Sequence, residues 1–100
     1  MKTQLKKGVI EIYVLASLVN ENSYGYKIVH DLNKYIELTE STLYPILRRL
    51  EQKNALTTYN VLYQNRNRKY YCITNIGKKM IDEFLQEWQT VKQIYEIIRK

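Results

Sequence analysis

The sequence predicts a mostly α-helical fold with one β-hairpin, and two observations carry this prediction. Apolar side chains recur every three to four residues over four separate stretches of the 100-residue chain. Between the third and fourth stretches, residues 59–73 alternate instead, as the strands of a hairpin do. One Pro and three Gly argue against a disordered or linker-rich chain, so we expect one compact domain with its own core.

The first helix is predicted from about Gln4 to Val19. A polar turn at residues 20–23 follows the last apolar position and ends the helix. The apolar side chains of this stretch fall on one face, which consists of Leu5, Val9, Ile12, Leu15, Ala16 and Val19.

The second helix is predicted over residues 24–35, with its inward positions at Ile28, Val29 and Leu32. Ser23 is expected to be its N-cap, because a serine hydroxyl can accept a hydrogen bond from the first free amides of a helix. Gly25 inside this helix costs about 1 kcal/mol relative to alanine. Such a cost is tolerated where two backbones approach closely, so we expect the first helix to cross at Gly25.

The third helix contains the stretch STLYPILRRLEQKNAL, residues 41–56. Four large aliphatic side chains have the spacing i, i+3, i+4, i+7 and form one apolar stripe: Leu43, Ile46, Leu47 and Leu50. The remaining face is polar and lies opposite the stripe or on its flanks. It comprises Ser41, Tyr44, Pro45, Arg48, Arg49 and Gln52.

Two threonines compete for the cap of this third helix. If Thr39 is the N-cap, Pro45 falls in the second turn, where it removes one backbone hydrogen bond. If Thr42 is the N-cap, Pro45 lies in the first turn without cost. At the other end, Asn54 is expected to terminate the helix in the left-handed conformation.

The hairpin is predicted within residues 55–74. Its alternating positions are Tyr59, Val61 and Tyr63 on one strand and Tyr71 and Ile73 on the other. We expect residues 64–67 (QNRN) to form the tip, which lacks the glycine of a tight turn but contains asparagine, a residue that tolerates positive φ.

Thr74 is expected to cap a long last helix. Its large apolar residues are separated by 3, 4, 3, 4 and 3 positions, which is a heptad seam formed by Ile81, Phe84, Trp88, Val91, Tyr95 and Ile98. We interpret this seam as a dimer interface with the same helix of a second subunit. The alternative is that the stripe packs only on its own domain.

The positive charge is concentrated in the middle of the chain. The net charge is +6, and residues 41–79 contain eight basic side chains and one acidic one, so this part carries +7 and the remainder −1. Including Glu40, just outside the chosen boundary, lowers the figure for the middle part to +6. This distribution is typical of a surface that binds a polyanion.

Three helices followed by a two-stranded hairpin form the order of a winged helix-turn-helix. In that fold the third helix enters the major groove of DNA, and the hairpin, or wing, lies beside it. The predicted DNA-binding residues are therefore those of the exposed third-helix face and the cations at the wing tip: Ser41, Thr42, Tyr44, Pro45, Arg48, Arg49, Arg66, Arg68 and Lys69. The predicted partner is double-stranded DNA.

Four segments resemble the PadR family of bacterial transcriptional repressors, in its short form with a single C-terminal helix. They are YGYKIVHDL, STLYPILRRLEQKNAL, RKYYCITNIGKKMI and the Trp-bearing last helix, and together they extend from about residue 8 to residue 98. The resemblance implies a homodimer that binds an inverted-repeat operator. From the sequence itself we expect one compact unit, with a DNA-binding domain at 1–75 and a dimerisation helix at 76–100. The lone Cys72 and the lack of a long apolar run lead us to expect a cytoplasmic protein.

The same resemblance implies roles for single residues. Recognition would fall to Thr42, Tyr44, Pro45 and Arg48, and the wing contacts to Arg68 and Lys69. The QNRN tip departs from the family pattern, in which glycines are common at this place, and this bears on the length and flexibility of the wing.

A ligand site is also implied by the resemblance. In the multidrug-binding branch of the family, a Trp at the place of Trp88 stacks flat aromatic ligands at the dimer interface. The candidate site here consists of Trp88, Lys92 and Ile12, and Lys92 would disfavour cationic compounds. The alternative is that Trp88 only fills the interface.

Several other classes are not expected. His30 lies beside Asp31 on a helix and Cys72 on a strand, without the spacing of a catalytic pair, a metal site or a phosphate loop. We therefore expect no enzyme, cofactor or metal. No apolar run is long enough to cross a bilayer, so no membrane partner is expected. A winged-helix module for protein contact or DNA partitioning, without repression, is the alternative function.

Overall fold

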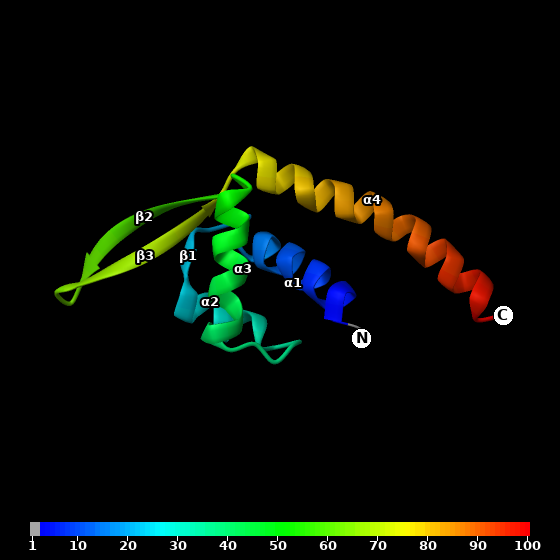
Figure 1. Ribbon diagram of the computed structural model, residues 1–100, viewed down its shortest axis with the longest axis horizontal. Coiled ribbons are helices and arrows are strands. Elements are labelled where there is room, and N and C mark those ends of the chain that lie inside the picture. Colours follow the sequence, from blue (N-terminus) through cyan, green and yellow to red (C-terminus); the bar gives the residue numbers. More distant parts are fainter. Residues whose placement is uncertain (1–2) are drawn as a thin grey trace.

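A computed structural model describes residues 3–100 of the chain, with side chains from residue 7 onward, so the predicted inward position of Leu5 lies outside the described residues. The predicted fold class is confirmed: the protein is mostly α-helical, and one long β-hairpin projects from it (Figure 1). In chain order the elements are α1 (Thr3–Ser17), β1 (Ser23–Tyr24), α2 (Gly25–Leu32), α3 (Glu40–Gln52), β2 (Leu56–Tyr63), β3 (Arg66–Ile73) and α4 (Asn75–Ile98).

One hydrophobic core holds α1, α2, α3 and the base of the hairpin together. Its fully buried side chains include Val14, Leu15, Leu18, Ile28, Leu32, Leu43, Leu47, Leu50 and Leu56. The predicted stripe of α3 is confirmed, since all four of its members are buried. The predicted face of α1 is wrong at Ala16 and Val19, which are exposed. The helix ends at Ser17, so Val19 lies beyond it. The buried positions are Ile10, Val14 and the predicted Leu15 on the helix, with Leu18 just after its end.

A short strand, β1, precedes α2 and was not predicted. Its two residues pair with Tyr70 and Tyr71, which gives a three-stranded antiparallel sheet in the order β1-β3-β2. Ser23 is therefore a strand residue, and the prediction that it caps α2 is wrong. The N-cap position is held by Tyr24, whose extended backbone makes no side-chain cap hydrogen bond. The start of α2 is therefore held by the pairing of β1 with β3, and not by a serine cap.

The ends of α3 are fixed by specific hydrogen bonds. Thr39 is the N-cap, because its hydroxyl accepts a hydrogen bond from the Thr42 amide at 3.3 Å, and Pro45 consequently lies in the second turn. Asn54 has a φ of 62°, as predicted for a left-handed terminus. The Ala55 amide donates to the Leu50 carbonyl, and the Asn54 amide donates to the Glu51 carbonyl, which together form a Schellman motif.

The tip of the hairpin is shorter than predicted. Only Gln64 and Asn65 form the turn, since Tyr63 already pairs with Arg66. Their φ values are 49° and 62°, and positive φ at both central positions is typical of a type I′ turn, which suits the twist of a two-residue hairpin. The strands are therefore regular to their ends, and the wing is long in spite of its missing glycine.

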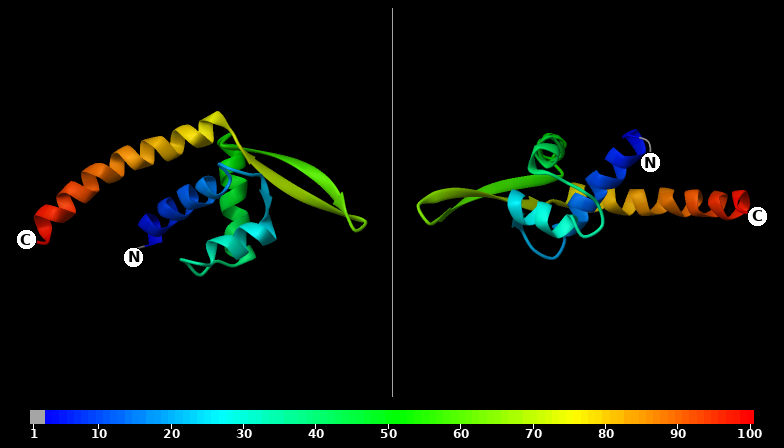
Figure 2. Two further views of the ribbon diagram at one scale, coloured as in Figure 1. Left: turned by 180° about the vertical axis from the view of Figure 1, so that it is seen from behind. Right: turned by 90° about the horizontal axis from the view of Figure 1, so that it is seen from below.

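The last helix, α4, begins at the hairpin and extends away from the domain on the side opposite to the wing (Figures 1 and 2). Thr74 is its N-cap, as predicted, and accepts a hydrogen bond from the Gly77 amide. The first turns of α4 pack on the core through Met80 and Ile81. The second half of α4 is exposed along its whole length.

Gly77 in α4 and Gly8 in α1 should respond oppositely when each is replaced by alanine, as measured by the free energy of unfolding. A Cβ at Gly77 would lie 2.6 Å from the Ala55 carbonyl oxygen and 2.7 Å from the Ile73 side chain, whereas a Cβ at Gly8 meets no described atom within 4 Å. Gly77→Ala should lower the free energy of unfolding by about 1–3 kcal/mol. Gly8→Ala, inside α1, should raise it by about 0.5–1 kcal/mol. Urea unfolding of both variants measures the difference, and similar midpoints would contradict this packing.

Candidate nucleic-acid interface

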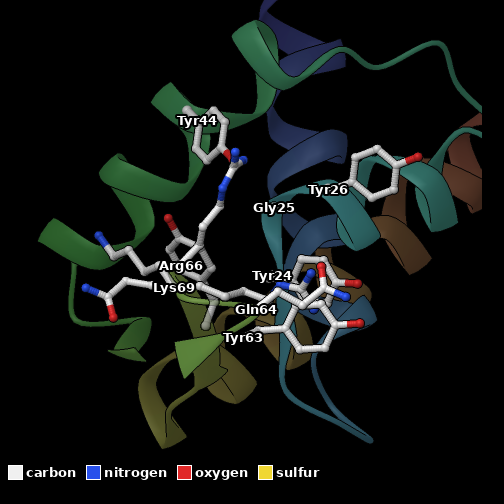
Figure 3. Close-up of a pocket in the computed structure, with 11 residues that line it drawn as sticks. Tyr24, Gly25, Tyr26, Tyr44, Tyr63, Gln64, Arg66 and Lys69 are labelled. Carbon is white, nitrogen blue, oxygen red and sulfur yellow. The ribbon is translucent and has the colours of Figure 1, made fainter. Parts of the chain in front are cut away.

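An open groove of about 690 Å³ separates the wing from α3 and the start of α2 (Figure 3). Its walls carry five tyrosines, three cations and two amides, and the lining consists of Tyr24, Gly25, Tyr26, Tyr44, Tyr63, Gln64, Arg66, Asn67, Arg68, Lys69 and Tyr71. Tyr44 projects into the groove from α3, and the ring of Tyr26 lies apart from the other labelled side chains (Figure 3). The groove therefore brings together residues of α3 and of the wing, as the predicted fold requires.

The tyrosine of α3 packs on the glycine of α2. A Cβ at Gly25 would lie 2.5 Å from the Tyr44 hydroxyl and 2.9 Å from the ring carbon that carries it. The prediction that the backbone of the first helix crosses at Gly25 is therefore wrong, because the atoms nearest to this glycine belong to a side chain of α3. In this arrangement the Tyr44 ring occupies the space that a side chain at residue 25 would need.

The N-terminal end of α3 presents hydroxyl groups. The Thr39 hydroxyl lies 3.0 Å from the Ser41 hydroxyl and 3.1 Å from the Thr42 hydroxyl. Ser41, Thr42 and Pro45 are all exposed. The first amides of a helix and small hydroxyl side chains form a favourable surface for an anion, so this end of α3 is suited to approach phosphate.

The two arginines of α3 have different surroundings. Arg48 is exposed and has no ion pair with any of the described residues. Arg49 donates a hydrogen bond to Glu11 of α1 at 2.7 Å, and Lys53 lies 3.8 Å from the same half-buried carboxylate. The structure therefore separates the predicted pair, because Arg49 is bound to α1 whereas Arg48 lines a smaller hollow beside the groove, together with Tyr44, Lys69 and Tyr71.

The three cations of the wing also differ. Arg66 lines the groove at the tip and makes no ion pair with the described residues. Lys69 lies 3.6 Å from Glu51 of α3, across the base of the groove. Arg68 has its guanidinium over the rings of Tyr24 and Tyr63, at 4.0 Å and 4.1 Å from their centroids. These are three different environments for residues that the sequence presents as one cluster.

Tyr71 forms the floor between α3 and the wing. It is buried, and burial raises the pKa of its hydroxyl, with Tyr44 and Glu51 adding to the effect and Arg48 opposing it. The phenol therefore stays neutral at physiological pH. Tyr71 therefore adds no negative charge to the groove, and the acidic group beside it is the carboxylate of Glu51, which is paired with Lys69.

The groove tyrosines Tyr24, Tyr26, Tyr63 and Tyr71 were missed as site residues. A signal for them is present in the composition, since ten of the twelve aromatic residues are tyrosine, and this excess predicts half-buried edges or interfaces. The sequence could not say which tyrosines meet, because Tyr24 belongs to β1, Tyr63 to β2 and Tyr71 to β3.

The seam residues of α4 lie outside the groove. Phe84 and Trp88 stack with centroids 5.9 Å apart, and Trp88 remains 43% exposed. Lys92 is exposed on the same helix, and Ile12 is half-buried on α1 against the core. Further apolar side chains are exposed on α4, namely Leu85, Val91, Ile94, Tyr95, Ile97 and Ile98.

The described part of the chain has neither a membrane-spanning helix nor a metal site. Residues 3–100 contain no helix long and apolar enough to cross a membrane. The same residues contain no cluster of three or more His, Cys, Asp or Glu side chains arranged to hold a metal ion. Cys72 is free and half-buried, and His30 is exposed.

Comparison with solved structures gives the same architecture in several bacterial proteins. A Clostridium difficile PadR family transcription regulator is 32% identical, with a TM-score of 0.81 over 91% of this chain and 98% of its own. A Streptococcus mutans protein is 38% identical, with a TM-score of 0.81 over 93% and 89%. An Eggerthella lenta PadR family transcriptional regulator is 30% identical, with a TM-score of 0.87 over 97% and 87%.

A family model also matches the sequence itself. Residues 14–83, which include the whole helix-turn-helix and the wing, match the model of the transcriptional regulator PadR-like family. Members of this family are transcription regulators and not enzymes, which confirms the expectation that the chain is no enzyme. The match favours transcription regulation over a module for protein contact or DNA partitioning. The chain belongs to the PadR-like family of transcriptional regulators and binds DNA.

Proposed function

We propose that the protein is a homodimeric repressor that binds an inverted-repeat operator through the groove between α3 and the wing. The observation that carries this proposal is the groove itself, which the wing cations Arg66 and Lys69 line together with the neutral Tyr71. The exposed Arg48 of α3 lines an adjoining hollow that shares Tyr44, Lys69 and Tyr71 with the groove. A negatively charged duplex complements this surface. A repressor can act simply by occupying a promoter, so these contacts are sufficient for the proposed role.

In this proposal, α3 reads the sequence. Its exposed N-terminal end, with Ser41, Thr42 and Pro45, approaches the major groove, and its bulky buried stripe stays in the core. Arg48 is one turn further along the same face, where an arginine can donate two hydrogen bonds to guanine. Tyr44 contacts DNA with the exposed part of its ring while the rest is held against Gly25. Arg49 is assigned to the α1 contact instead.

The wing contributes affinity rather than sequence preference. Arg66 lies beside the turn of Gln64 and Asn65, where it can neutralise a backbone phosphate or enter the minor groove. Lys69 pairs with Glu51 in the free protein at 3.6 Å, and both side chains are substantially exposed. Such a surface pair is worth little, so exchange of Glu51 for a phosphate costs little.

The dimer is proposed to form through α4. In it, residues 76–100 of the two subunits pack together and join the two 1–75 domains. The support is the exposed apolar surface of this helix, on which Trp88 is 43%, Val91 46%, Tyr95 58% and Ile98 73% exposed. Exposed apolar side chains in a contiguous row are typical of a protein interface. Their heptad spacing favours another helix as the partner, and Phe84 and Ile81 extend the row to the edge of the core.

A planar aromatic ligand at this interface is the finer part of the proposal. The observation that favours it is the Phe84–Trp88 stack, which leaves the second ring partly exposed where a subunit partner would approach. Trp88, Lys92 and Ile12 are the proposed contacts. Such a ligand regulates DNA binding only if it prefers the DNA-free arrangement of the dimer.

The first prediction separates reading from positioning on DNA. Arg48→Ala should narrow the gap in affinity between operator and random duplex, by about 1–3 kcal/mol for a lost base contact. Arg66→Ala should weaken both duplexes alike and lower the slope of log K against log salt by about one. Lys79→Ala, which removes a cation paired with Glu83 on α4, is the control and should change neither. If Arg66→Ala changes the preference for the operator and Arg48→Ala does not, the roles assigned to α3 and the wing are wrong.

A second prediction concerns the dimer seam. Trp88→Glu combined with Val91→Glu should give a monomer in analytical ultracentrifugation, because two buried carboxylates would have to be desolvated. Operator affinity should fall by about 10²-fold or more through loss of the second half-site. Gln86→Glu with Gln93→Glu adds the same charge on the opposite side of α4 and should leave the dimer intact. A dimeric seam variant would refute this interface.

The third prediction tests the ligand. Neutral or anionic planar dyes should quench the fluorescence of the single Trp when they stack on it, and cationic dyes should bind less well because of Lys92. Lys92→Asp should shift the preference toward cationic dyes. If no dye quenches at micromolar concentration, or if the charge preference does not change, Trp88 is only an interface residue.

A further inference from the structure

Arg68 occupies an unusual place among the wing cations, because its guanidinium lies between two aromatic rings. The Tyr24 centroid is 4.0 Å away and the Tyr63 centroid 4.1 Å away. Tyr63 ends β2, while Tyr24 belongs to β1, beyond the other edge of β3. Figure 3 shows the two rings close together on the same side of the wing. Arg68 therefore connects the strands on both sides of its own.

The contact continues toward the base of the sheet. Tyr24 meets Tyr70 edge to face, with ring centroids 5.3 Å apart, and Tyr70 stacks on its cross-strand partner Tyr59 at 5.4 Å. The Tyr59 hydroxyl accepts a hydrogen bond from the Asn22 side chain at 3.3 Å. Four tyrosines and Arg68 thus form one row on a single face of the sheet, which we call the tyrosine row: Tyr24, Tyr59, Tyr63 and Tyr70 with Arg68.

Backbone pairing alone holds only the base of the wing. Strand β1 pairs with Tyr70 and Tyr71 of β3 and does not extend to residues 66–69. Beyond that point the wing is a two-stranded ribbon, and such a ribbon is only marginally stable by itself. The Arg68 guanidinium is the group that ties this outer part back to β1, since it bridges Tyr63 near the tip to Tyr24.

Tyr24 of β1 is also next in sequence to a residue that contacts α3. Tyr24 is followed directly by Gly25, on which the Tyr44 ring of α3 packs. The path from the wing to α3 therefore runs through Arg68, Tyr24, Gly25 and Tyr44. Of these two consecutive residues, Tyr24 contacts the wing and Gly25 contacts α3.

From this geometry we propose that Arg68 is a positioning residue that fixes the wing relative to α3, and that it is not a phosphate contact. This inference rests on the proposed function, because it concerns the spacing of the two DNA-binding elements, and it replaces the wing role that the family resemblance implies for Arg68. The guanidinium carbon lies over two rings, about 4 Å from each centroid. A planar guanidinium stacks on rings far better than the compact ammonium of lysine does, so the two residues are not interchangeable here.

The test compares charge-conserving substitutions in the full-length protein. Arg68→Lys should weaken operator binding by about tenfold, since a stacked cation is lost, and should leave the salt slope unchanged. Tyr24→Leu, which changes no charge, should cause a similar loss, and the double variant should lose little more than either single one. Lys79→Arg, a charge-conserving change on α4 outside the groove, is the control and should bind like the wild type. Tyr24→Phe keeps the ring and should lose much less affinity than Tyr24→Leu.

A second readout does not involve DNA. In the free protein, ¹⁵N relaxation should show that residues 61–68 become more mobile in Arg68→Lys and Tyr24→Leu, while the amides of α3 and the melting temperature stay close to those of the wild type. If Arg68→Lys binds DNA like the wild type, or if Arg68→Gln lowers the salt slope by about one as a lost phosphate contact does, the proposal is overturned. If the wild type binds no duplex specifically, the proposed function fails, and the relaxation data still decide whether Arg68 orders the wing.

Discussion

The burial of one stripe of α3 is the constraint on which the rest of the site depends. Leu43, Ile46, Leu47 and Leu50 all lie in the core, and together they fix the rotation of the helix about its own axis. That rotation leaves the opposite side exposed and directs Arg48 toward the groove. A slip of one residue would turn the helix by about 100° and bury the arginine. The same aliphatic residues that stabilise the domain therefore select which side chains can meet DNA.

Contacts on both flanks of α3 supplement its buried stripe. On one flank the ring of Tyr44 rests on Gly25, and on the other Arg49 is bound to Glu11 of α1. Asn33 holds the loop before α3 in place through two hydrogen bonds to Leu38. Its side-chain NH₂ donates to the Leu38 carbonyl, and its side-chain oxygen accepts from the Leu38 amide. A helix held from both flanks and at its start loses little further freedom when it binds, which favours affinity.

The periodic parts of this fold could be predicted from the sequence, and the pairings between distant residues could not. The α3 stripe, the Thr74 cap and the left-handed Asn54 follow from local spacing and local chemistry. Strand β1 has only two residues, too few for any periodicity, so Ser23 was interpreted as a cap. Arg49 and Arg48 are identical in type and adjacent, and the partner that separates them, Glu11, is 38 residues away. The position of Arg68 between Tyr24 and Tyr63 likewise depends on sheet pairing that no local pattern encodes.

The wing and α4 extend in opposite directions from the helical core (Figure 1), so the proposed DNA-binding and subunit contacts lie at opposite ends of the molecule. The measurement that tests this division most directly is the mapping of amide and side-chain NMR shifts on addition of a duplex selected by the protein from a random pool. The account predicts that the largest shifts fall in residues 41–48 and 63–69, with residues 84–98 nearly unchanged. Large shifts along α4 with an unperturbed α3 would contradict it.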